Sequence, residues 1–322
     1  MTIQGAASIA AIAAFAASAP VASAQEGVAG TLVGASAGRS AATLSVEEAD
    51  DAIDGTLSAD LTTHYFFRGL IQEDQGVIFQ PAIDLNVGLW EGEGDVTAFG
   101  LLLGQWNSLH SGPTGSSGSA SNSPSSWYES DFYVGCNLDF AAGFSVAANW
   151  VAYTSPNGSY DTINEINVAI GMDDSGWYGE SGFGGLAPTL TLALETDGQT
   201  DQGAEPSGTD QGIFVGFGIA PEFSLGTLGE GDAAPEVTLA VPVNAGFSFS
   251  DYYEDGDGDD DRFGYWDVGG VVSMPLSSVP TRFGDWTLTA GVTAVFLSGN
   301  QKDLNHDEGF ELVGTVGLSI GF

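Results

Sequence analysis

The sequence predicts an all-β protein, an antiparallel up-and-down transmembrane β-barrel of about 12 strands that occupies residues 55–322. Three observations predict this fold. Apolar and polar residues alternate along many segments, the number of such segments is even, and the last one ends on an aromatic residue, Phe322. Single-chain bacterial barrels have an even number of strands, and lipid-facing and lumen-facing side chains alternate along each of them.

The bulk composition agrees with this fold. The chain has 47 glycines, 11% aromatic and 15% charged residues, and a mean hydropathy of +0.09. A near-zero average is compatible with a membrane barrel, because half of each strand is polar or small. After the N-terminal segment, no apolar run approaches the ~20 residues that a transmembrane helix needs.

The first 24 residues have the composition of a signal peptide. An Ala-rich stretch ends on Ala22-Ser23-Ala24, a small-x-small cleavage pattern, although residues 1–4 carry no Lys or Arg. The alternative, an uncleaved anchor, is disfavoured because an Ala-rich segment spans membranes poorly. We therefore expect cleavage near Ala24, a flexible periplasmic leader at 25–54, and location in the cell outer membrane.

The final segment shows the alternation most clearly. Phe310, Leu312 and Val316 share one face, whereas Glu311 and small or polar residues share the other. Such strict alternation predicts one long β-strand with an apolar face. Segments of this texture are expected at 55–68, 77–90, 96–107, 127–140, 144–154, 162–173, 188–196, 212–222, 236–252, 264–275, 285–298 and 310–322.

An even strand count places both termini on the periplasmic side. The connections expected to face outward are 69–76, 108–126, 155–161, 197–211, 253–263 and 299–309. Most of them are long and rich in Ser, Gly and Asp. The connections at 174–187 and 223–235 are long for periplasmic turns and fit this arrangement least well.

The charge balance restricts the ligands. The chain has 43 acidic and 5 basic residues, a net charge of −38. Such a charge repels phosphate backbones, so we expect no nucleic-acid partner, and anionic ligands are disfavoured. Cations, neutral solutes and divalent-bridged lipid headgroups are better candidates. The single cysteine, Cys136, cannot form an internal disulfide, and it lies in phase with apolar residues expected to face lipid.

The last eight residues resemble the assembly signal of outer-membrane barrels, a polar-x-Gly-x-x-apolar-x-aromatic pattern that ends at the chain terminus. Thr315, Gly317, Ile320 and Phe322 occupy its specified positions. The resemblance implies that the barrel-assembly machinery binds the C-terminal strand and that outer-membrane lipid surrounds the folded protein.

Residues 58–70 are similar to the opening strand of TorF-type porins, which reads roughly S-x-Y-x-F-R-G. Tyr65, Phe67, Arg68 and Gly69 match it, whereas Thr63-His64 stands where the family has Ser-Asp. The similarity covers about 35 residues, because 80–85 continue it into the returning strand. It implies a small outer-membrane barrel with a transport function.

The alternation also assigns residues to the lumen. The inward set chosen as lumen and selectivity residues is acidic, with Arg68 as its one Arg or Lys. Its members are Asp60, His64, Arg68, Asp84, Glu129, Asp131, Asp139, Glu165 and Asp267. An open lumen of this kind favours cations and small neutral solutes. In the alternative, these acids pair with Arg68, His64 and water inside a plugged barrel.

An acidic, Gly-containing loop at 254–261 offers a possible Ca²⁺ site, with carboxylates at Asp255, Asp257, Asp259 and Asp261. Asp260 and Trp266 stand where the EF-hand pattern needs Gly and Glu, so a solvated loop tip is the alternative. We expect no other cofactor.

Enzyme patterns are absent from the sequence. The three histidines lie in separate segments, and there is neither a G-x-S-x-G motif nor a metal-spaced His/Cys cluster. The sequence therefore predicts a porin-like channel for passive diffusion of small cationic or neutral solutes. The alternative is a non-conducting surface barrel, adhesive or structural, whose acidic outer loops bind divalent cations. A soluble Gly-rich β protein would leave the Phe322 signal unexplained, and the oligomeric state stays open.

Overall fold

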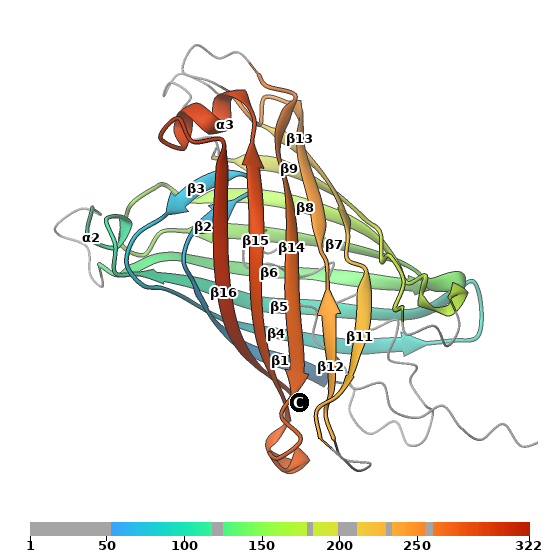
Figure 1. Ribbon diagram of the computed structural model, residues 1–322. Helices are drawn as coiled ribbons and strands as arrows, with labels where there is room; N and C mark the ends of the chain where they lie inside the picture. Colours follow the sequence, from blue (N-terminus) through green and yellow to red (C-terminus); the bar gives the residue numbers. More distant parts are fainter. Residues whose placement is uncertain (1–52, 118–124, 179–182, 199–210, 230–233, 255–259) are drawn as a thin grey trace, which may run out of the picture.

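The computed structural model describes residues 53–117, 125–178, 183–198, 211–229, 234–254 and 260–322. These residues form a closed antiparallel barrel in which β16 pairs with both β1 and β15, and β14 pairs with β15 (Figure 1). Except for Ile53 and Asp54, with which the barrel wall begins, the predicted signal peptide and leader lie outside the described residues.

The barrel strands are β1 (Ile53–Thr62), β4 (Ile78–Glu91), β5 (Val96–His110), β6 (Trp127–Phe140), β7 (Phe144–Thr154), β8 (Ile163–Met172), β9 (Thr189–Asp197), β10 (Ile213–Ile219), β11 (Glu222–Thr227), β12 (Glu236–Ala240), β13 (Val243–Ser250), β14 (Phe263–Pro275), β15 (Asp285–Leu297) and β16 (Phe310–Gly321). Two short strands, β2 (Tyr65–Phe67) and β3 (Leu70–Glu73), form a separate hairpin. The helical segments are α2 (Thr114–Ser117), α3 (Gly299–Leu304), η1 (Ala141–Gly143), η2 (Ser175–Trp177) and η3 (Thr281–Phe283).

The wall has 12 positions, as the sequence predicts, because two positions are each built from two strands. Pro221 separates β10 from β11, and Pro242 separates β12 from β13. Proline has no N–H to give to a neighbouring strand. The backbone hydrogen bonding between neighbouring strands nevertheless continues through both prolines. The Pro221 carbonyl oxygen accepts a 2.8 Å hydrogen bond from Val241, and the Pro242 carbonyl oxygen accepts one of 2.8 Å from Gly269. The all-β, up-and-down barrel prediction is therefore confirmed.

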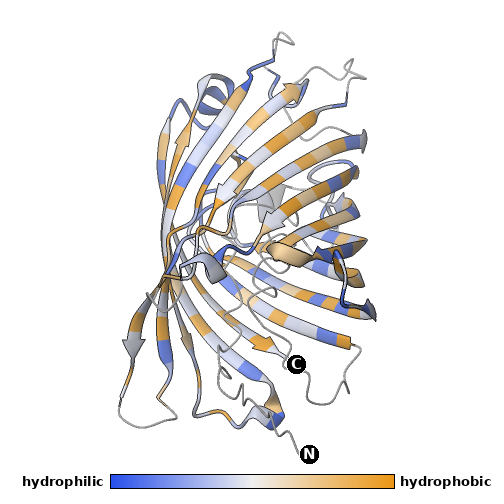
Figure 2. Cartoon of the chain, turned by 90° about the vertical axis from the view of Figure 1, so that its right-hand side faces the viewer, coloured by the Kyte–Doolittle hydropathy of each residue, from blue (hydrophilic) through white to orange (hydrophobic). Residues whose placement is uncertain are grey.

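Figure 2 shows bands of alternating hydropathy along the strands. The exposed fractions of the side chains assign the apolar residues to the exterior of the barrel and the polar ones to its interior. On β16, Leu312 and Val316 are each 54% exposed. On the opposite face of other strands, Gln80, Asn167 and Asp267 are buried. This is the reverse of a soluble protein, in which polar side chains face out. It is the side-chain arrangement of a barrel whose outer surface contacts lipid.

Among the residues that the structure describes, no helix is both long enough and apolar enough to cross a membrane.

The predicted first strand, 55–68, is wrong at its end. The strand β1 stops at Thr62, and the chain then folds back as the β2–β3 hairpin around a two-residue turn, Arg68-Gly69. Both turn residues have positive φ, +48° and +82°. These angles are those of the tight turns that match the twist of a β-hairpin. Gly69 is also required sterically, because a Cβ there would lie 2.9 Å from the ring of Tyr265.

This hairpin, residues 65–73, also replaces part of the outward loop predicted at 69–76, since it folds into the barrel. Phe66 packs with Val295 and Val313 on β15 and β16. Phe67 packs against Tyr153 on β7, with ring centroids 5.2 Å apart. Because β7 and β8 lie about halfway round the ring of strands from β15 and β16, the hairpin spans the lumen from wall to wall.

Candidate lumen site

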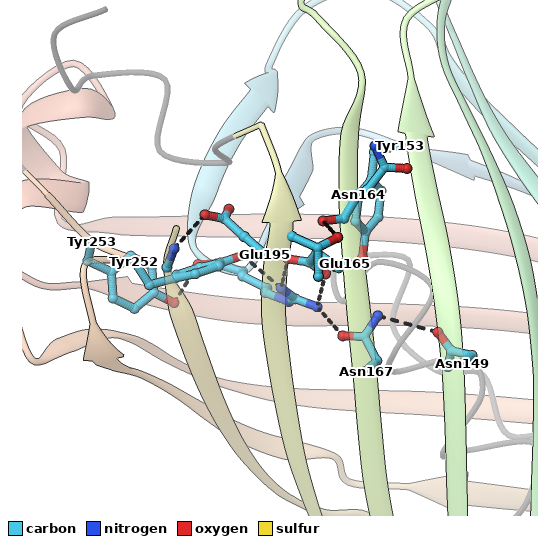
Figure 3. Close-up of polar contacts among 11 residues, drawn as sticks. Asn149, Tyr153, Asn164, Glu165, Asn167, Glu195, Tyr252 and Tyr253 are labelled. Carbon is cyan, nitrogen blue, oxygen red and sulfur yellow. Dashed lines mark hydrogen bonds and ion pairs between the residues drawn. The ribbon is translucent and has the colours of Figure 1, made fainter. Parts of the chain in front are cut away.

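The tip of the hairpin is held by an ion pair. Arg68 Nη1 donates hydrogen bonds of 2.8 Å to Glu165 Oε1 and to the hydroxyl oxygen of Tyr252, and Nη2 donates one of 3.1 Å to Glu165 Oε2. Nη2 also lies 3.3 Å from Asn167 Oδ1 (Figure 3). The guanidinium and the carboxylate are 2% and 0% exposed. A bidentate, fully buried pair fixes geometry more strictly than a surface pair does.

Aromatic rings complete the surroundings of this guanidinium. Its carbon lies 4.5 Å from the ring centroid of Phe214 and 4.8 Å from that of Phe67. Such stacking suits the planar arginine cation. The Tyr253 hydroxyl donates a 2.9 Å hydrogen bond to the Arg68 carbonyl oxygen. Burial disfavours the charged form, but the neighbouring Glu165 carboxylate outweighs this and raises the pKa of Arg68 above its usual range.

The other end of the hairpin is held by a hydrogen-bond chain. Glu73 Oε2 accepts hydrogen bonds of 2.9 Å and 2.7 Å from the backbone N–H and the hydroxyl of Thr114. Thr114 Oγ1 lies 2.6 Å from His110 Nδ1, and His110 Nε2 lies 2.7 Å from Ser108 Oγ. A hydrolase activates serine through such a chain. Here Ser108 is 0% exposed, so we interpret the chain as a tether between β3 and the wall.

The sequence-predicted lumen residues fall into separate groups. Arg68 and Glu165 form the ion pair, although Arg68 comes from the hairpin and not from the first barrel strand as predicted. Glu129 and Asp131 lie together on β6 and are buried. Both groups lie at the loop end of the barrel, defined here as the end where β1 stops and β16 begins.

The remaining members line other parts of the wall. Asp84 accepts a hydrogen bond from the Tyr133 hydroxyl, and Asp267 Oδ1 accepts one of 3.0 Å from Asn244. Asp84, Asp139 and Asp60 are each only partly buried. His64 lies in the connection before the hairpin, outside the barrel strand to which it was assigned, and its Nε2 is 3.9 Å from Glu311.

The predicted assembly-signal residues belong to the strand that closes the barrel. In the register of β16 with β1, Thr315 pairs with Thr62 and Ile320 with Leu57. A Cβ on Gly317 would meet Asp60 on the lumen side. The backbone N–H of Phe322 donates to the Gly55 carbonyl at 3.0 Å, and the reciprocal bond is 2.8 Å.

Of the predicted Ca²⁺ ligands, Asp255, Asp257 and Asp259 lie outside the described residues. Asp261 Oδ2 accepts a 3.1 Å hydrogen bond from the backbone of Asn300. Within the described part of the chain, no three or more His, Cys, Asp or Glu residues are grouped as a metal site.

Solved structures of outer-membrane barrels resemble this chain at low identity. A bacterial polysaccharide outer membrane secretin aligns with a TM-score of 0.43 and 7% identity, covering 85% of this chain and 99% of that one. The β domain of the Bordetella autotransporter BrkA gives 0.39 and 11%, covering 84% and 99%. An outer membrane channel from Pseudomonas putida gives 0.38 and 12%, covering 86% and 97%. Scores this low do not decide what the chain does. No protein-family model and no curated protein matches it.

Proposed function

We propose that this protein is a porin-like barrel of the outer membrane through which small cationic or neutral solutes diffuse passively. The observation that carries the proposal is the inverted side-chain pattern, with an apolar exterior around a polar, acidic interior. A closed barrel satisfies its backbone hydrogen bonds internally, so this exterior can contact hydrocarbon. Acidic groups on a pore wall select for cations.

The hairpin divides the interior into two parts. At the loop end it packs into two hydrophobic clusters and buries Arg68. Away from the hairpin, Asp84 and Asp139 are partly exposed inside the wall. We therefore propose an acidic vestibule that opens at the end holding the chain termini and is narrowed by the hairpin at the loop end.

Two further expectations belong to this proposal. Export would use the signal peptide at 1–24, and insertion would use the barrel-assembly machinery acting on the C-terminal strand. Membership of the TorF-type porins is supported by Tyr65, Phe67, Arg68 and Gly69. In this chain those residues build the hairpin.

The packing of the hairpin favours a second candidate. A barrel whose hairpin never moves would be a non-conducting surface barrel, with a role in adhesion or structure and with acidic loops that bind divalent cations. The buried Arg68–Glu165 ion pair, which holds the hairpin against β8, supports this second candidate. Conductance separates the two candidates.

Thiol labelling tests the orientation and the charge of the wall together. In a Cys136→Ser background, Asn137→Cys should place a thiol in the vestibule without changing any acid. A cationic methanethiosulfonate should react about tenfold faster there than an anionic one of similar size, because acidic clefts concentrate cations. The preference should shrink at high salt. The measurement is the labelling rate in outer-membrane vesicles.

Native Cys136, one residue away, is the matched control. Its neighbours in phase, Phe132 and Val134, are exposed on the outer face. Cys136 should therefore react with an apolar maleimide and with neither charged reagent. If the charged reagents labelled Cys136 as fast as they labelled Asn137→Cys, the orientation of β6 would be refuted. If the anionic reagent labelled Asn137→Cys faster than the cationic one, the acidic vestibule would be refuted.

A further inference from the structure

Glu129 and Asp131 place two carboxyl groups side by side inside the barrel. They are separated by one residue on β6, so both point to the lumen face. Their exposed fractions are only 4% and 0%. The two groups are close enough to interact directly, and the Glu165 carboxylate also acts on Asp131. Buried carboxylates are costly unless a positive charge, a hydrogen-bond donor or a metal ion compensates their negative charge.

The described residues do not supply that balance. Neither carboxylate oxygen of Asp131, nor Oε2 of Glu129, has a hydrogen-bond donor among them other than the carboxyl group of the neighbouring acid of the pair. Arg68, the nearby guanidinium, is bound in bidentate fashion by Glu165. When Glu129, Asp131 and Glu165 are ionised, three carboxylates face one guanidinium, which leaves two negative charges buried.

The donors around the pair are oxygen atoms. The hydroxyl groups of Tyr65, on the hairpin, and Tyr160 lie beside Glu129. Both ring nitrogens of His110 already contact Ser108 and Thr114. Oxygen donors without nitrogen or sulfur suit hard cations. Of these, Ca²⁺ accepts irregular sets completed by water, whereas Mg²⁺ demands a near-ideal octahedron.

We infer that Glu129 and Asp131 form a binding site for a divalent cation of the Ca²⁺ class, between β6 and the hairpin. Two carboxylates bind the ion, and Tyr65, Tyr160 and water complete its surroundings. The bound ion neutralises the two excess charges and ties the hairpin to the wall at a point distinct from the Arg68 and Glu73 contacts. The site does not depend on whether the barrel conducts ions.

Terbium luminescence tests this site in the full-length protein folded in detergent micelles. Tb³⁺ replaces Ca²⁺ at oxygen sites, and tyrosine sensitises its emission only at short range. The test uses a background in which Asp255, Asp257, Asp259 and Asp261 are asparagine, so that the acidic loop does not contribute. Excitation of tyrosine should give saturable Tb³⁺ emission that Ca²⁺ displaces and Na⁺ does not.

The double variant Glu129→Gln/Asp131→Asn should weaken Tb³⁺ binding by at least about tenfold, since losing a group that merely supports a ligand already costs about that much. The matched control, Glu91→Gln/Asp285→Asn, removes two exposed acids at the opposite end of the barrel and should bind Tb³⁺ as the background does. Heat-modifiable gel mobility verifies that each variant is folded. No saturable emission in the background protein would overturn the inference and show that the pair is neutralised by protons. Equal binding by the Glu129/Asp131 variant would also overturn it.

Discussion

Replacing Arg68 by alanine is expected to lower the free energy of unfolding by about 3–5 kcal/mol, because it leaves the Glu165 carboxylate buried without its partner. The substitution also removes the contacts that hold the hairpin tip to β8 and to Tyr252. We therefore expect the hairpin to detach and the conductance of the barrel to increase. Urea unfolding in lipid vesicles measures the first effect, and single-channel recording measures the second.

Arg262→Ala is the matched control for this prediction. The Arg262 side chain is 77% exposed and lies 3.8 Å from Asp260. An exposed pair at this separation contributes at most about 1 kcal/mol. The control should therefore leave conductance unchanged. If Arg68→Ala had wild-type conductance and lost no more stability than the control, the prediction that this ion pair holds the hairpin in place would be wrong.

Deletion of Phe322 is expected to reduce the amount of folded protein in the outer membrane by about tenfold or more. The deletion removes the aromatic end of the assembly signal and two backbone hydrogen bonds to Gly55, each contributing about 1 kcal/mol to the closing seam. The measurement is the heat-modifiable fraction in membrane preparations.

Phe310→Ala is the control for that deletion. Phe310 lies at the other end of β16 and is also an exposed aromatic residue, at 49% against 58% for Phe322. Its loss should leave assembly near the wild-type level. Wild-type amounts of folded protein after deletion of Phe322 would contradict the role of the terminal residue, and an equal defect in Phe310→Ala would mean that any exposed aromatic residue of the strand matters.

The strands were predictable because their side chains alternate between lipid and lumen over ten or more residues, as on β16. The hairpin was not predicted, because Tyr65 and Phe67 continue the apolar phase of Leu57 and Leu61. One signal was present. Arg68-Gly69 lies between two short β-type runs, and a glycine in a two-residue connection is typical of a tight hairpin turn.

The residues that interact with Arg68 were harder to predict from the sequence. A buried arginine requires a carboxylate, but the chain offers 43 acidic residues, and Glu165 lies 97 residues away from Arg68. Likewise, the long connection predicted at 223–235 is partly strand, because β11 continues to Thr227 after the interruption at Pro221. Local patterns identify strands and their faces, whereas long-range pairing depends on the register of the closed barrel.

The sign of the reversal potential in planar bilayers tests most directly whether an acidic lumen carries cations. In a KCl gradient at low ionic strength, the wild-type protein should show a potential of the sign produced by K⁺ preference. The double variant Asp84→Asn/Asp139→Asn, which removes the two partly exposed acids of the vestibule, should shift it toward zero, and the wild-type preference should weaken above about 0.1 M salt, where screening acts within ~10 Å. Absence of current from both the wild type and Arg68→Ala would support the non-conducting surface barrel. A wild-type potential of the sign produced by Cl⁻ preference would contradict the assignment of these acids to a conducting lumen.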